Sequence, residues 1–181
     1  MAMPPALRRA VLSVHVICSV GWIGAAAAYP ALGIAAEASQ LPATVRAAWI
    51  AMELTGWYVI VPAAGLAVLT GLVISLGTPW GLLRHYWVIF ALVLSTLSLI
   101  VLVIHMPTVT ATADLARTTD DTSAAALGGD VLHPALGLVI LIVVAVLNIH
   151  KPRGLTPYGR RKLPRQKLTS GAPSAIRGFA Q

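Results

Sequence analysis

Four long apolar stretches, separated by shorter polar segments, organise the chain. They cover about residues 10–36, 47–76, 86–105 and 131–150. A helix of about 20 apolar residues is long enough to span the ~30 Å hydrocarbon layer of a membrane. A membrane-spanning segment must satisfy its own backbone hydrogen bonds, which favours helices. The pattern therefore predicts an all-α fold, an integral membrane four-helix bundle that occupies residues 1–150.

The polar segments predict loops and a tail. Residues 107–130 hold several aspartates, and we expect them to form the longest loop. Residues 151–181 are basic, rich in proline and glycine, and lack apolar periodicity. Such a composition cannot bury enough apolar surface to fold alone. We therefore expect a disordered tail after the fourth helix.

Composition supports the membrane assignment. The chain is 57% hydrophobic and only 10% charged, whereas a soluble domain carries about 25% charged residues. The net charge of +7 could suggest nucleic acid, but most of the lysines and arginines fall in the tail. We expect that tail to attract anionic lipid headgroups, and we expect no nucleic-acid partner. The single cysteine, Cys18, excludes a disulfide framework.

The distribution of basic residues predicts the orientation. Arg8, Arg9 and Arg84 would lie on the same side of the membrane as the basic tail, and only Arg46 and Arg117 on the other. Basic residues concentrate in cytoplasmic segments. Both termini are therefore expected in the cytoplasm.

The stretch HVICSVGWIG contains the most unusual residue of the first helix, His15. An ionisable side chain within a membrane span is costly and by default suggests a functional site. His15, Ser19 and Trp22 follow a helical spacing and share one face. The alternative is that Trp22 and its neighbours serve packing alone.

A second group of candidates lies at the opposite membrane boundary. His105 ends the third predicted helix and His133 begins the fourth, while Met106 and Asp130 flank them. Glu53 lies at the same level of the second helix. Histidine, methionine and carboxylate ligands suit copper, and histidine or methionine suits a haem iron. Alternatively, the histidines serve as interfacial or capping residues, and Glu53 hydrogen-bonds across helices.

Several blocks of the sequence resemble a family of small bacterial integral membrane proteins of unknown function. These blocks are HVICSVGWIG, MELTGWYVIVP, LTGLVISLGTPWGLLRHYWV, LVIHMP and HKPRGLTPYG, and the similarity extends over about residues 8–165. The resemblance implies a multi-pass protein of the bacterial inner membrane, and it lends no activity.

More distantly, His15, Trp22 and Gly24 resemble the first helix of two further groups. These are the copper-resistance protein D membrane domains and the haem-binding membrane protoporphyrinogen oxidase. The resemblance implies a haem role for His15, and His105 matches a histidine at the corresponding helix end. In the oxidase group a lysine of the third helix is also important, and here that position is Ala91. The departure argues against oxidase activity.

We therefore expect a membrane protein that binds haem b or copper, with a role in redox chemistry or electron transfer. The expected cofactor-binding residues are His15, His105 and His133, and the expected metal ligands are His105, His133, Glu53 and Met106. No residue is assigned a catalytic role, because no soluble-enzyme motif is present. Copper handling or small-solute transport is one alternative. The other is a structural accessory protein that contacts a membrane partner or a second copy of itself.

Overall fold

The computed structural model describes residues 3–78, 81–152 and 154–161. The elements are helices α1 (Pro5–Ala38), α2 (Pro42–Thr55), η1 (Gly56–Ile60), α3 (Val61–Gly77), α4 (Tyr86–Thr118), α5 (Asp121–Ala125), α6 (Leu132–His150) and α7 (Pro157–Arg161). The described residues form no strand beyond one isolated bridge between His85 and Leu155. The predicted all-α class is confirmed.

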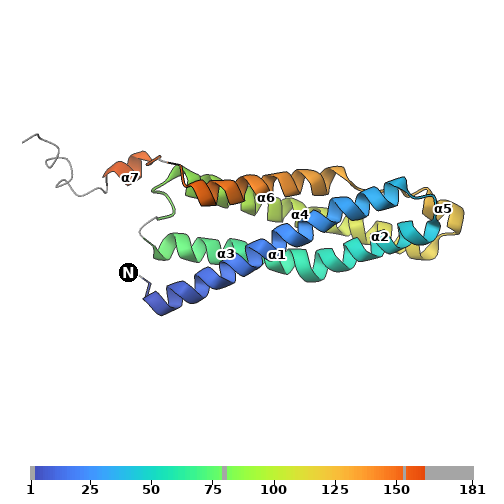
Figure 1. The fold of residues 1–181 in the computed structure, drawn as a ribbon, viewed down its shortest axis with the longest axis horizontal. Helices are drawn as coiled ribbons and strands as arrows, with labels where there is room; N and C mark the ends of the chain where they lie inside the picture. The colour runs from blue at the N-terminus through green and yellow to red at the C-terminus, as the bar shows by residue number, and fades with distance from the viewer. Residues whose placement is uncertain (1–2, 79–80, 153, 162–181) are drawn as a thin grey trace, which may run out of the picture.

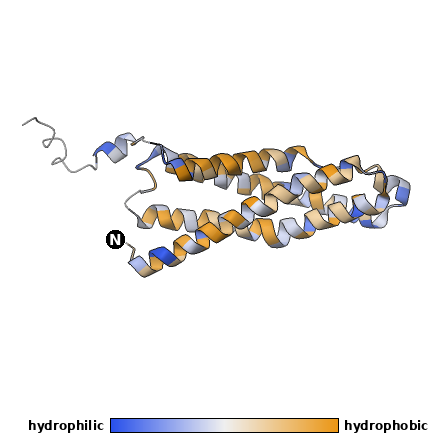
Figure 2. Cartoon of the chain, in the orientation of Figure 1, coloured by the Kyte–Doolittle hydropathy of each residue, from blue (hydrophilic) through white to orange (hydrophobic). Residues whose placement is uncertain are grey.

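Four helical segments are long and apolar enough to cross a membrane. They are α1, the continuous segment α2–η1–α3, α4 and α6. Apolar residues dominate the middle of these helices, and hydrophilic residues gather toward the ends (Figure 2). Many large apolar side chains on the outside are exposed, such as Ile17, Ile104 and Ile149. Such an apolar exterior suits contact with lipid.

The helices pack side by side, with α1 crossing the others obliquely (Figure 1). Helix α1 contacts α2, α3 and α6, while α4 contacts α2, α3 and α6 from the other side. The largest fully buried side chains come from α2 and the second half of α4: Val45, Met52, Met106 and Val109. The tightest core therefore lies toward the end of the molecule that carries α5.

The helices differ in length, so their ends lie at different positions along the long axis of the molecule. At 1.5 Å per residue, α1 and α4 are about 50 Å long, whereas the 19 residues of α6 extend only about 28 Å. Parts of α1, α2 and α4 therefore extend past the start of α6 at Leu132. The length of α6 is close to the ~30 Å thickness of a hydrocarbon layer.

The third long helix continues well beyond its predicted end at residue 105. It runs to Thr118 with Pro107 inside it, so much of the expected loop 107–130 is helical. A proline removes only one backbone hydrogen bond. Val109, Ala113 and Ala116, spaced as on one helix face, are buried and hold the extension against its neighbours.

The remaining part of that segment contains the short helix α5. The carboxylate of its N-cap, Asp120, accepts hydrogen bonds from the backbone N–H groups of Thr122 and Ser123. Hydrogen bonding from Ser123 holds the pKa of Asp120 below its usual range. This capping fixes the turn between α4 and the segment that leads to α6.

The described start of the tail contacts the segment before α4. The Thr156 hydroxyl donates to the backbone oxygen of Leu83 (2.5 Å), and the Thr156 N–H donates to the backbone oxygen of Arg84 (3.0 Å). The same hydroxyl accepts from the Gly159 N–H and so caps α7. The local sequence favours this short helix, since a threonine followed by Pro157 is a helix-start signal. Residues 162–181 lie outside the described part of the chain.

Most described basic residues and the acidic residues lie at opposite ends of the molecule. Residue Met3 hydrogen-bonds to Gly77, and residues 154–156 bond to the 83–86 segment, so these segments share one end. This end carries Arg8, Arg9, Arg84, Lys151, Arg160 and Arg161. The carboxylates of the sequence, Glu37, Glu53, Asp114, Asp120, Asp121 and Asp130, all lie toward the other end, around α5.

Candidate metal centre

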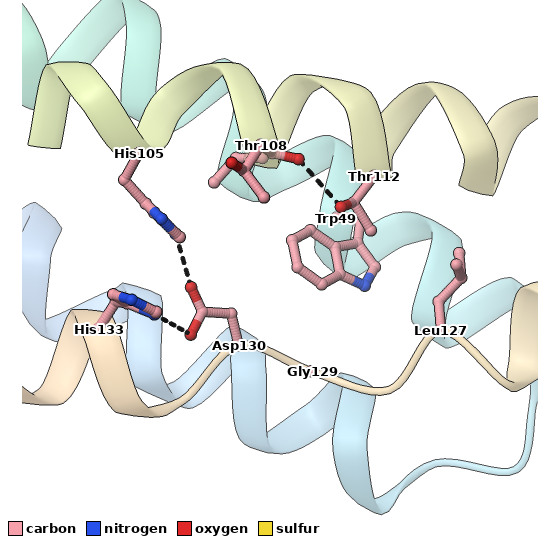
Figure 3. A pocket seen from close by; sticks show the side chains of 9 residues that line it. Trp49, His105, Thr108, Thr112, Leu127, Gly129, Asp130 and His133 are labelled. Carbon is pink, nitrogen blue, oxygen red and sulfur yellow. Dashed lines mark hydrogen bonds and ion pairs between the residues drawn. The ribbon is translucent and has the colours of Figure 1, made fainter.

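Two histidines and an aspartate meet where α4 approaches the start of α6 (Figure 3). The Nε2 atom of His105 lies 2.7 Å from Oδ2 of Asp130, and Nδ1 of His133 lies 3.2 Å from Oδ1. The two imidazole rings are stacked, with centroids 4.4 Å apart and planes inclined by 22°. One ligand atom from each of the three residues lies within 4.8 Å of the others.

The local sequence explains how Asp130 and His133 come together. Asp130 precedes α6 by two residues, and His133 lies in its first turn. Residues three apart at a helix start lie on one side of it. His105 comes from the middle of α4, which packs against α6. The cluster therefore joins two helices through one carboxylate.

The backbone before Asp130 is held in place by polar contacts from two other helices. Trp49 of α2 donates from its indole N–H to the backbone oxygen of Gly128 (3.0 Å). Glu37 of α1 accepts a hydrogen bond from the Gly129 N–H (2.7 Å). Gly128 has a positive φ of 62°, a conformation that glycine adopts without strain.

A close approach of α1 also fixes the position of Asp130. A Cβ atom on Gly33 would overlap with the backbone oxygen of Asp130, and one on Gly129 would overlap with the backbone oxygen of Gly33. Both positions therefore require glycine. The loop lies directly on the helix, which limits the ways in which the Asp130 carboxylate can move.

The cluster borders a pocket of about 320 Å³. Besides the three ligand residues, the pocket is lined by Trp49, Thr108, Val109, Thr112, Leu127 and Gly129 (Figure 3). The His105 and Asp130 side chains are largely covered, at 21% and 17% exposure, whereas His133 is 57% exposed. The arrangement offers two imidazole nitrogens and a carboxylate beside a small open space. Zinc and non-haem iron(II) use such a ligand set and leave positions open for water or substrate.

Two of the residues expected at this site make other contacts. Glu53 forms an ion pair with Arg117 of α4, which also pairs with Asp114 at 2.7 Å. Met106 is fully buried, and its sulfur lies 3.9 Å from the hydroxyl of Tyr29. Glu53 does not belong to the group of His, Cys, Asp and Glu ligand atoms that lie close together among the described residues.

His15 lies in a different part of the molecule. Its Nδ1 atom is 3.0 Å from the backbone oxygen of Ala67 and 3.1 Å from the Thr70 hydroxyl, both on α3. The ring lines a second cavity, which Trp22 and Ala91 also border. Trp22 and Ala91 are buried, at 5% and 8% exposure. The structure thus brings His105 and His133 together and keeps His15 apart from them.

The candidate ligand that the sequence pattern does not assign is Asp130. It flanks the histidine pair in the sequence, but a loop position does not predict the direction of its side chain. The one signal for it is the three-residue spacing of Asp130 and His133 across a helix start. The backbone contacts to Gly33 and Glu37, which orient it, come from a distant part of the chain.

Comparison with protein-family models, with curated proteins and with solved structures finds no match to this chain. The family resemblances drawn from the sequence therefore stay predictions, and the functional argument rests on the site itself.

Proposed function

We propose that the protein is a multi-pass membrane protein that binds one first-row transition-metal ion through His105, Asp130 and His133. The observation that carries the proposal is the convergence of two imidazoles and one carboxylate within 4.8 Å, from α4, from the start of α6 and from the loop before it. An exposed acidic cluster alone would carry little weight. Here two neutral nitrogen donors join the carboxylate, and imidazole favours transition metals over calcium or magnesium.

The geometry favours a metal ion over a haem at this position. A haem with two histidine ligands requires the imidazoles to approach the iron from opposite faces of the macrocycle. The rings of His105 and His133 instead stack on each other, and Asp130 hydrogen-bonds to both. A single ion can draw on all three side chains, because one ligand atom of each lies within 4.8 Å of the others.

The ligand chemistry favours zinc or iron(II) over copper(I). Soft sulfur ligands select copper(I), and Met106 is buried against Tyr29 instead of facing the histidines. A bound ion would supply Lewis-acid chemistry, and an iron ion would add redox chemistry. Around it, Trp49 and Leu127 would limit access of water.

The charge separation supports an orientation with both termini in the cytoplasm. Among the described residues, basic side chains concentrate at the end that carries the start of α1 and the end of α6, and the carboxylates lie around α5. By the positive-inside tendency, the metal centre would lie at the opposite, non-cytoplasmic boundary of a bacterial inner membrane. His133 would then be reachable from the aqueous side.

Metal analysis of the purified protein tests the proposal. The full chain is purified in detergent from cells supplied with zinc, iron or copper, and its metal content and visible spectrum are measured. We expect about one zinc or iron ion per chain and no Soret band. The His133→Ala variant should lose that metal, whereas His150→Ala, at the other end of α6, should retain it. A Soret band, or equal metal content in both variants, would contradict the proposal.

A further inference from the structure

A second cavity of about 470 Å³ lies at the opposite end of the molecule from the metal centre. It is bordered by the first half of α1, the second half of α3, the start of α4 and the second half of α6. Helices α1 and α6 meet near Gly33 and Asp130, and they diverge toward the other end (Figure 1). The cavity lies where these two helices have separated, and residues of both line it.

The walls of this cavity are mostly apolar. Val16, Val20, Leu141, Val144 and Ile149 are among the lining residues. Its volume lies within the roughly 300–1,000 Å³ of small-molecule pockets. Several of these side chains are also exposed on the outside of the helices, for example Val20 at 64%. A hydrocarbon chain could therefore enter sideways from the membrane.

The charged residues that line the cavity are all basic. Arg8 and Lys151 border it, and no carboxylate does. Arg8 makes no ion pair with any described carboxylate, because those of the sequence lie toward the α5 end. The cavity thus has a positive end and an apolar wall, which matches the two parts of an anionic amphiphile.

His15 places one polar group deeper along the same wall. The backbone oxygen of Ala67 can only accept a hydrogen bond, so the neutral ring donates from Nδ1 and keeps Nε2 as its remaining acceptor. The ring packs on Gly71, where a Cβ would come within 3.2 Å of Cε1. Nε2 can accept from a carboxylic acid, and a protonated ring can donate to a carboxylate. A carboxylic headgroup can therefore form a hydrogen bond with His15 whether the imidazole ring is neutral or protonated.

We propose that this cavity binds a single-chain anionic lipid. The acidic headgroup lies between His15 and the positive end formed by Arg8 and Lys151, and the chain lies along Val16, Val20 and Leu141. A fatty acid and a lysophospholipid share this chemistry. The inference does not depend on the metal centre, which draws on other residues.

Competitive displacement of a fluorescent fatty acid from the purified full-length protein tests the proposal. The competitors are palmitate, a lysophosphatidylglycerol with the same chain, and the neutral alcohol hexadecanol. We expect at least one anionic competitor to bind roughly three- to tenfold more tightly than the alcohol. Preference for palmitate alone assigns a fatty acid, and preference for the phospholipid alone assigns a lysophospholipid. Equal binding of all three would overturn the proposal.

Two matched pairs of variants locate the binding site. Arg8→Gln should abolish the preference for the anionic competitor, whereas Arg9→Gln, which alters an exposed neighbour outside the cavity, should leave it unchanged. His15→Phe should weaken binding of the anionic lipid, and His150→Phe should not. Equal effects within each pair would place binding elsewhere and overturn the proposal. Circular dichroism of each variant confirms that the helices are retained.

Discussion

At the scale of single residues, Asp130 decides what the histidine pair can do. Without it, His105 and His133 would offer only two stacked imidazole rings. With it, a carboxylate lies within hydrogen-bonding distance of one nitrogen of each ring, so three candidate ligands converge. The carboxylate also adds a negative charge, which favours binding of a divalent cation.

Replacing Asp130 with asparagine should therefore weaken metal binding while keeping the side-chain volume. We expect Asp130→Asn to raise the dissociation constant for zinc by at least about tenfold, or about 1.4 kcal/mol. Calorimetric titration of the purified protein measures this change. Asp114→Asn serves as the control, because that carboxylate is exposed and pairs with Arg117. Equal affinities for the two variants would show that Asp130 is no ligand.

At the scale of elements, Arg46 stabilises the unexpected extension of α4. Its guanidinium donates to the backbone oxygens of Ala116 (2.8 Å) and Thr119 (2.7 Å) and pairs with Asp121 at 2.6 Å. These oxygens lie at a helix C-terminus, where carbonyl groups lack partners within the helix. One side chain of α2 thus ties together the end of α4 and the start of α5.

Arg46→Gln should loosen this end of α4. The loss of charged hydrogen bonds to carbonyl groups should lower the free energy of unfolding by about 1–3 kcal/mol. Hydrogen exchange of a peptide covering residues 113–119 should speed up, and the thermal midpoint should fall. Arg9→Gln, which removes an exposed arginine, should change neither. Unchanged exchange in 113–119 would rule out this role of Arg46.

The contact between α1 and the loop before α6 gives a second test at this scale. Gly33→Val should push the backbone of Asp130 away and reduce metal affinity by at least about tenfold, with the helix content retained. Gly24→Val in the same helix is the matched control, because a Cβ there meets no atom within 4 Å. If both variants bind zinc like the unaltered protein, the loop does not position the ligand.

These elements also show how far sequence reasoning extends. The four apolar helices could be predicted from their length and composition. The proximity of His105 and His133 could be predicted from their positions at the ends of predicted helices. The predicted end of α4 was wrong because the polar residues after 107 indicated a loop, whereas a buried face and the contacts of Arg46 continue the helix. The pairing of Glu53 with Arg117 depends on which helix faces meet, and local sequence patterns do not specify that.

At the scale of the whole molecule, the separation of charges predicts orientation. In a Cys18→Ala background, Ala6→Cys and Ser123→Cys place exposed thiols at opposite ends. A membrane-impermeant maleimide applied to right-side-out vesicles should label Ser123→Cys at once. Ala6→Cys should react only after the membrane is permeabilised. The reverse labelling pattern would contradict the orientation proposed from the positive-inside tendency.

Metal titration of the full-length protein tests the central claim most directly. The metal-free protein in detergent is titrated with zinc by calorimetry, in parallel with the double variant His105→Ala/His133→Ala and with His150→Ala. The account predicts one zinc ion per chain for the unaltered protein and for His150→Ala, and loss of that binding in the double variant. Zinc binding that is absent from the unaltered protein, or unchanged in the double variant, would contradict a metal centre at His105, Asp130 and His133.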